Sequence, residues 1–213
     1  MIKRILDEVT HKNKKGIVLS CFSPLVMIIT FIIEISLAIY TFIKSRKAKS
    51  DVGIVLVLLF LGTFQLAEYQ ICAGSNMLLW ARIGLFAITF LPVLGIYLIS
   101  KLHKESILLK IGFLLAIAFV VFFLFIPRTI GGAVCGGNYI IFDINSSIHN
   151  LYGYYYLGFL FLGIWQALKG VKSDESKKDI KSALKWLIIG YLSFILPLTM
   201  VYILIPITRA AIA

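Results

Sequence analysis

The sequence LLKIGFLLAIAFVVFFLFI, residues 108–126, decides the fold class. Its one charged side chain, Lys110, lies close to the start. An α-helix rises about 1.5 Å per residue, so this stretch is long enough to cross the ~30 Å hydrocarbon layer of a bilayer. Lipid offers no hydrogen-bond partner to exposed backbone groups, and a helix is therefore the conformation expected here.

Five further stretches have the same character, which predicts a polytopic integral membrane protein. No period-two alternation of the kind found in membrane β-barrels is present. The predicted fold class is therefore all-α, a membrane bundle of six transmembrane helices. The predicted spans are 17–43, 52–72, 78–100, 108–126, 151–168 and 184–207.

The composition excludes several classes of protein. Of the 213 residues, 60% are apolar and 15% are charged, whereas a soluble domain has about 45–50% and about 25%. This excludes a soluble enzyme, a disordered protein and a disulfide-rich secreted module. The sequence contains no HExxH motif, no Ser-His-Asp set and no paired intramembrane aspartates. We therefore predict no enzymatic activity, no metal and no cofactor.

The distribution of lysine and arginine predicts the orientation in the cell membrane. Thirteen of these residues follow the first, third and fifth spans, and three lie on the opposite side when the N-terminal tail is left out. Cytoplasmic loops carry the excess, so the N-terminus is predicted outside and residues 127–149 form an extracellular loop. The net charge of +11 is explained by these membrane flanks, so the lipid bilayer and not nucleic acid is the expected partner.

The tail, residues 1–15, opposes this orientation because it holds five cations. Its apolar residues fall on one helical face, which predicts a basic amphipathic helix lying on a membrane surface. The transmembrane domain then covers residues 16–208. Six spans return the C-terminus to the outside, so a truncated seven-helix bundle is the alternative to a six-helix protein.

Five motifs occur in an order that carries a family resemblance: KSRKAKSD at 44–51, FQLAEYQIC at 64–72, WARIGLFAITFLPVLGIYL at 80–98, HNLYGYYYLGFLFLG at 149–163 and ALKWLIIGYLSFILPL at 183–198. Together they resemble the N-terminal seven-transmembrane sensor region of bacterial and archaeal histidine kinases. The resemblance covers roughly residues 25–205. It implies six of the seven helices of such a sensor, a cytoplasmic signalling partner and a homodimer.

The resemblance does not extend to an output domain. The sequence has no phospho-accepting histidine box and no glycine-rich ATP-binding segment. Retinal chemistry is not expected either, because no lysine lies in the interior of a span, away from its ends, to form a Schiff base.

Glu34 is the most unusual residue of the first span, since a carboxylate inside the hydrocarbon layer is costly. It shares one helical face with Met27, Thr30 and Thr41, so this face is expected to pack inward or to line a wet cavity. Two interpretations stay open. Glu34 is either a group that responds to protons or ligands, or a protonated carboxyl hydrogen-bonded between helices.

A second polar group is predicted near the outer end of the second and third spans. It comprises Gln65, Glu68 and Tyr69 on one side of a short loop and Arg82 on the other. Glu68 and Arg82 lie at similar depths, so we predict that they form an ion pair. The alternative is that this group forms the floor of an outward-facing ligand pocket.

The loop at 127–149 offers weaker signals. Its GGAVCGG run is interpreted as a turn, and NYIIFDI at 138–144 as a short strand. The tyrosines of LYGYYYLGF at 151–159 are interpreted as an interfacial aromatic belt and not as a ligand cage. Cys72 and Cys135 both fall on the outer side and are predicted to form a disulfide, with Cys21 as the competing partner.

These features predict a membrane sensor or signalling module without catalytic activity, which senses a small ligand or the membrane from its outer half. The alternative is a small secondary transporter or channel with Glu34 as the coupling residue. The spans show no inverted repeat and no midplane charge ladder, which counts against transport.

Overall fold

The computed structural model describes residues 24–48, 52–102, 107–127, 129–135, 140–173 and 177–199. The predicted amphipathic tail at 1–15 lies outside these residues. The described part is built from six helices and one two-stranded hairpin, so the all-α prediction is confirmed with the hairpin as an addition. The elements are α2 (Pro24–Ala48), α3 (Gly53–Cys72), α4 (Met77–Leu102), α5 (Ile107–Phe125), β1 (Ile130–Cys135), β2 (Ile140–Ile144), α6 (Ser146–Lys172) and α7 (Lys178–Thr199).

Four of the helices are long and apolar enough to cross a membrane, namely α2, α3, α4 and α5. This composition indicates a multi-pass membrane protein. Two predicted spans, 151–168 and 184–207, correspond to α6 and α7, which do not reach the same apolarity within the described residues. The tyrosines of α6 and the lysines at the start of α7 lower their hydropathy.

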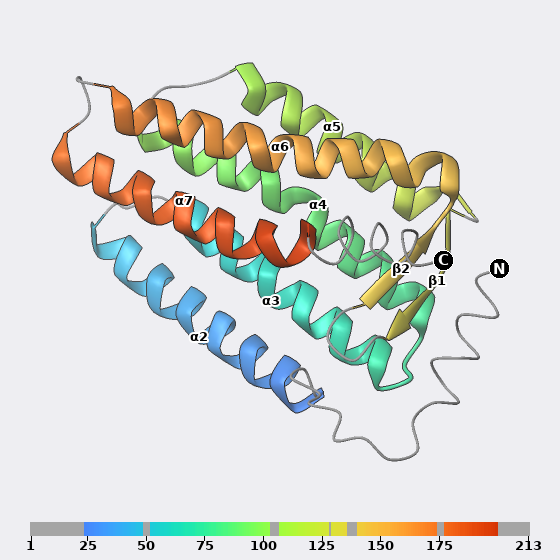
Figure 1. Cartoon of the computed structure of the whole chain (residues 1–213). Helices are drawn as coiled ribbons and strands as arrows, with labels where there is room; N and C mark the ends of the chain where they lie inside the picture. The colour runs from blue at the N-terminus through green and yellow to red at the C-terminus, as the bar shows by residue number, and fades with distance from the viewer. Residues whose placement is uncertain are drawn as a thin grey trace, which may run out of the picture.

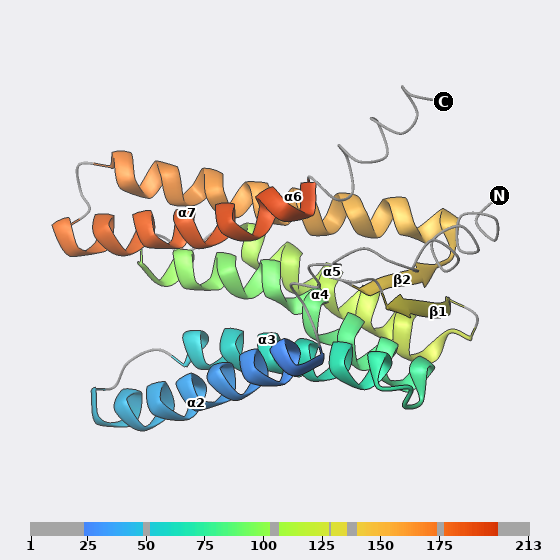
Figure 2. The ribbon, with the colours of Figure 1, turned by 60° about the horizontal axis from the view of Figure 1, so that its bottom comes forward.

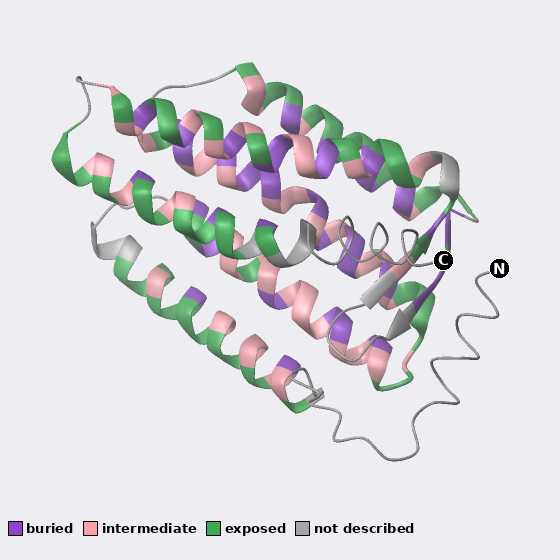
Figure 3. Cartoon of the chain, viewed as in Figure 1, coloured by how far each residue is buried: buried purple, intermediate pink, exposed green. Residues whose placement is uncertain are grey.

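The six helices form three layers of two. Figure 2 shows α2 and α3 in one layer, α4 and α5 in the next, and α6 and α7 in the third. Helix α4 lies at the centre and packs against α3, α5, α6 and β1, whereas the contacts of α2 are mainly with α3. Figure 3 shows the consequence: buried residues gather on α4, and α2 is largely exposed.

The two ends of the bundle differ in chemistry. At one end, which we call the lysine end, lie the C-terminal ends of α2, α4 and α6 and the starts of α3, α5 and α7 (Figure 1). At the other, the hairpin end, lie β1, β2 and the turn between α3 and α4. The three lysine-rich loops of the sequence therefore share one end, as alternating loops of a polytopic protein should.

The hairpin is anchored on the start of α4. Strands β1 and β2 pair antiparallel, with an irregularity between Ile130 and Gly132. The backbone N–H of Ala133 donates to Met77 Sδ at 3.0 Å. The predicted strand at 138–144 is confirmed as Ile140–Ile144, but the interpretation of GGAVC as a turn is wrong because it forms β1. Gly131 is the residue at this irregularity, and it lies close to the Asp143 carboxylate.

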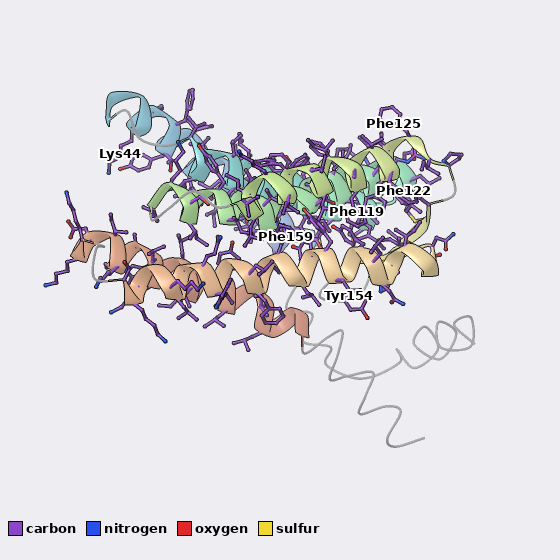
Figure 4. The ribbon with its side chains drawn as sticks, turned by 90° about the horizontal axis from the view of Figure 1, so that it is seen from above. Lys44, Phe119, Phe122, Phe125, Tyr154 and Phe159 are labelled. Atoms are coloured by element: carbon purple, nitrogen blue, oxygen red, sulfur yellow. The ribbon has the colours of Figure 1, made fainter. Side chains whose placement is uncertain are left out.

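An aromatic cluster between α5 and α6 fills the core next to α4. Phe119, Phe123 and Tyr152 form a set of edge-on and stacked rings with centroids 5.2–6.2 Å apart. Figure 4 shows Phe119 and Phe159 in the layer between these helices and Tyr154 directed away from it. The predicted interfacial belt of tyrosines is therefore wrong for Tyr152, Tyr155 and Tyr156, which are buried. Tyr154 is exposed, and its place at an interface stays a prediction.

Candidate functional site

Glu34 lies on the side of α2 that faces α3. Met27 and Ala38 on the same side are almost fully buried, at 2% and 1% exposure. The Glu34 side chain is half-buried, and its Oε2 atom is buried with no hydrogen-bond partner within the described part of the chain. The interpretation as a carboxyl hydrogen-bonded between helices therefore gains no support at this atom.

Gln65 of α3 contacts the face of α2 that carries Glu34. The Thr30 hydroxyl, one helical turn before Glu34, lies 3.3 Å from Gln65 Oε1 and also donates within α2 to the Val26 carbonyl at 2.9 Å. Residues four apart on a helix share a face. The structure thus brings Thr30, Glu34 and Gln65 to one interface between α2 and α3.

Glu68 lies one turn from the end of α3 at the hairpin end and is buried, at 9% exposure. Its neighbour Ala67 is fully buried, 3.4 Å from the place where a Cβ on Gly84 of α4 would lie. Tyr69, the next residue, is half-buried. This places a carboxyl group near the end of α3 at the hairpin end, and the sequence analysis had placed Glu68 near the same end of its helix.

Arg82 does not form the predicted ion pair. No such pair joins it to Glu68 among the described side chains, and Arg82 Nε is buried without a hydrogen-bond partner there. Depth along the helices does not fix the rotation of α4. Thr89, seven residues further along α4, shares the face of Arg82 and is hydrogen-bonded to tyrosines of α6, so this face of α4 is directed toward α6. The equal depth of Glu68 and Arg82 in the sequence gave no information about this rotation.

The side of α4 that carries Arg82 also carries Thr89, two turns further on. The Thr89 hydroxyl lies 3.1 Å from the Tyr152 hydroxyl, and the Tyr155 hydroxyl donates to the Thr89 carbonyl at 2.8 Å. Pro92 has no N–H, so the Ile88 carbonyl loses its usual helical donor. The Tyr155 hydroxyl bonds the next carbonyl along the same turn, that of Thr89. The sequence analysis missed this network, although the tyrosines were its signals.

Three further buried polar atoms, toward the lysine end, were also missed. Ser100 Oγ, Gln166 Oε1 and Tyr191 Oη have no hydrogen-bond partner within the described residues. The Tyr191 ring of α7 fits against Gly95 of α4 and Gly163 of α6, where any Cβ would collide with it. Tyr191 and the two glycines therefore make one close contact of α7 with α4 and α6, in addition to the buried Leu184 and Ile195 of α7.

Cys72 at the end of α3 is disulfide-bonded. Cys135 ends β1, but its side chain and all of Cys21 lie outside the described residues. Because β1 lies against α3, the contact favours Cys135 as the partner. The pairing itself stays a prediction.

The described residues contain no group of His, Cys, Asp and Glu able to hold a metal ion. Comparison with protein-family models, curated proteins and solved structures gives no match. The resemblance to histidine-kinase sensor regions therefore rests on the sequence motifs alone.

Proposed function

We propose that this chain is a membrane sensor or signalling module without catalytic activity of its own, which detects a small ligand or the membrane at its hairpin end. In this proposal all six described helices cross the bilayer, because α6 and α7 run alongside the four more apolar helices (Figures 1 and 2). The N-terminus and the hairpin lie outside, and the lysine end lies in the cytoplasm.

The observation that carries the proposal is Arg82, which has a buried, unpartnered Nε atom at the hairpin end. A buried N–H donor that lacks an acceptor is costly, and an ionisable residue inside a membrane protein indicates function. A ligand with an anionic or hydrogen-bond-accepting group would supply that acceptor.

A route for the signal is present in α4 and α6. Arg82 shares its side of α4 with Thr89, which is hydrogen-bonded to two tyrosines of α6. Helix α6 then leads to the lysine end. A cytoplasmic signalling partner would bind there, and the exposed side of α2 is the place where a second copy could form the homodimer.

A thermal-shift screen of small organic anions on detergent-solubilised protein tests this proposal. At least one compound should raise the melting temperature of the wild type and fail to raise that of Arg82→Met. Lys185→Met, which removes an exposed cation at the other end, should respond like the wild type. If no anion acts, or if one acts equally on Arg82→Met, Arg82 is not a ligand-binding residue.

A second function, a small transporter or channel, is favoured by one observation, the unpartnered Oε2 of Glu34 between α2 and α3. Proteoliposomes loaded with a pH-sensitive dye distinguish the two functions. Proton or cation flux that Glu34→Gln abolishes and Glu68→Gln retains would establish transport. Absence of flux in the wild type would exclude transport under these conditions and leave the sensor function as the proposal.

A further inference from the structure

The described charges are distributed very unevenly between the two ends of the bundle. At the hairpin end the described cation of the helices is Arg82, whereas nine lysines with described side chains lie toward the lysine end, with Asp179 as their acidic neighbour in α7. These lysines are Lys44, Lys101, Lys110, Lys169, Lys172, Lys177, Lys178, Lys181 and Lys185. Such an excess attracts anionic groups from the adjacent membrane surface.

Three of these lysines are held over aromatic rings by the same local arrangement. The Nζ atoms of Lys44, Lys101 and Lys169 lie 5.8, 5.6 and 3.7 Å from ring centroids. Each ring belongs to the residue four positions earlier, one helical turn back. We call these the aromatic–lysine pairs: Tyr40 with Lys44, Tyr97 with Lys101, and Trp165 with Lys169.

The pairs lie near the C-terminal ends of α2, α4 and α6, the three helices that run toward the lysine end. Helical side chains point back toward the N-terminus, so each ammonium lies at the level of its ring and not beyond the helix end. The rings of Tyr40 and Trp165 are exposed, at 61% and 51%. Exposed tryptophan and tyrosine rings mark the interfacial level of a bilayer.

We infer that the aromatic–lysine pairs bind the phosphate groups of anionic phospholipids in the leaflet at the lysine end. The ring restricts the lysine side chain and covers one side of its ammonium. The remaining N–H groups stay available to donate to a phosphate oxygen. Because the lysine is held in place before the lipid arrives, less conformational freedom is lost on binding. A surface lysine without a ring lacks this advantage.

The pair Trp165–Lys169 is the one to test, since it has the shortest separation and its ring is a fluorophore. With Trp80→Phe and Trp186→Phe, Trp165 is the remaining tryptophan. The variant with this single tryptophan is reconstituted in vesicles of phosphatidylcholine. One series contains increasing fractions of brominated phosphatidylglycerol, and the other contains increasing fractions of brominated phosphatidylcholine. Quenching of Trp165 then reports the relative affinity for each headgroup at this position.

We expect brominated phosphatidylglycerol to quench at lower fractions than brominated phosphatidylcholine, with a relative affinity of about fivefold, as one lysine near a charged surface provides. Lys169→Gln should abolish the preference. The matched control is Lys172→Gln, which removes the same charge from the same last turn of α6. This variant should keep most of the preference for phosphatidylglycerol.

Three results would overturn the inference. The first is equal quenching by the two lipids in the wild type. The second is an equal loss in Lys169→Gln and Lys172→Gln, which would show that general surface charge and not the pair attracts the lipid. The third is relief of quenching by inorganic phosphate at constant ionic strength, which would identify a site for free anions.

Discussion

Helices α2 and α4 have nearly the same length, 25 and 26 residues, and both are apolar, yet they occupy opposite environments. In the most apolar segment of each helix, 11% of the residues of α2 and 56% of the residues of α4 are buried. Small residues explain the difference. Ala81, Gly84 and Gly95 let α3, the hairpin and α7 approach the α4 backbone. The outward side of α2 carries exposed leucine and isoleucine instead.

The polar groups of the two helices follow the same division. Thr89 of α4 has two tyrosine hydroxyls as partners, whereas Glu34 of α2 leaves one carboxyl oxygen without a partner among the described residues. The comparison teaches that apolarity places a helix in the membrane, and that the distribution of small and polar side chains decides whether it faces protein or lipid.

The largest expected effect separates a core leucine from a peripheral one. Leu85→Ala on α4, at 0% exposure, should cost about 2–5 kcal/mol of unfolding free energy because it leaves a cavity. Leu37→Ala on α2, at 48% exposure, should change it by less than about 0.5 kcal/mol. Unfolding by SDS titration in mixed micelles measures both. Similar losses would show that α2 is packed as tightly as α4.

The next effect concerns the packing contact between α7 and α4. Gly95→Ala should displace the Tyr191 ring and cost about 1–3 kcal/mol, as overpacking does. The matched control is Gly158→Ala on α6, where nothing lies within 4 Å of the added carbon. That variant should be neutral or slightly stabilising in the same titration. A neutral Gly95→Ala would mean that α7 does not dock through Tyr191.

A smaller effect is expected where α6 supports the turn before Pro92. Tyr155→Phe removes the 2.8 Å bond to the Thr89 carbonyl and should cost about 0.5–1.5 kcal/mol. Tyr154→Phe, in the adjacent and 79% exposed residue, should leave the midpoint of unfolding unchanged. Equal midpoints for the two variants would exclude this support.

The smallest effect is expected between α2 and α3. Thr30→Val removes the 3.3 Å contact with Gln65 and should cost about 0.6 kcal/mol, the average for hydrogen bonds between membrane helices. Thr63→Val is the control, because the Thr63 hydroxyl donates only within α3, to the Leu59 carbonyl, among the described contacts. A loss in Thr30→Val above that of Tyr155→Phe would reverse the ranking of the two interfaces.

The existence of the helices could be predicted from hydropathy because lipid imposes a minimum apolar length on every span. Their neighbours could not, since hydropathy is the same for a lipid-facing and a protein-facing leucine. The tyrosines of α6 show the same difficulty. Tyr152 and Tyr155 would suit a membrane interface as well as the core. Their hydrogen bonds to Thr89, on another helix, place them in the core.

The unusual residues of the candidate site could be singled out from the sequence, but the contacts between them could not. Glu34, Glu68 and Arg82 stand out because charges inside spans are rare. Their contacts depend on helix rotation, which placed Gln65 next to Thr30 and put Arg82 on the face of α4 that carries Thr89. The strand at 140–144 was predictable from its β-branched and aromatic residues, whereas β1 was hidden by its glycines.

The central claim is that the hairpin end faces outside and the lysine end faces the cytoplasm. Asn150→Cys and Ser173→Cys place one thiol at each end of α6. Intact cells are treated with a membrane-impermeant maleimide, and the labelled peptides are identified by mass spectrometry. The account predicts that Asn150→Cys is labelled in intact cells and that Ser173→Cys is labelled only after the membrane is permeabilised. The reverse pattern would contradict the topology and the proposed external sensing site together.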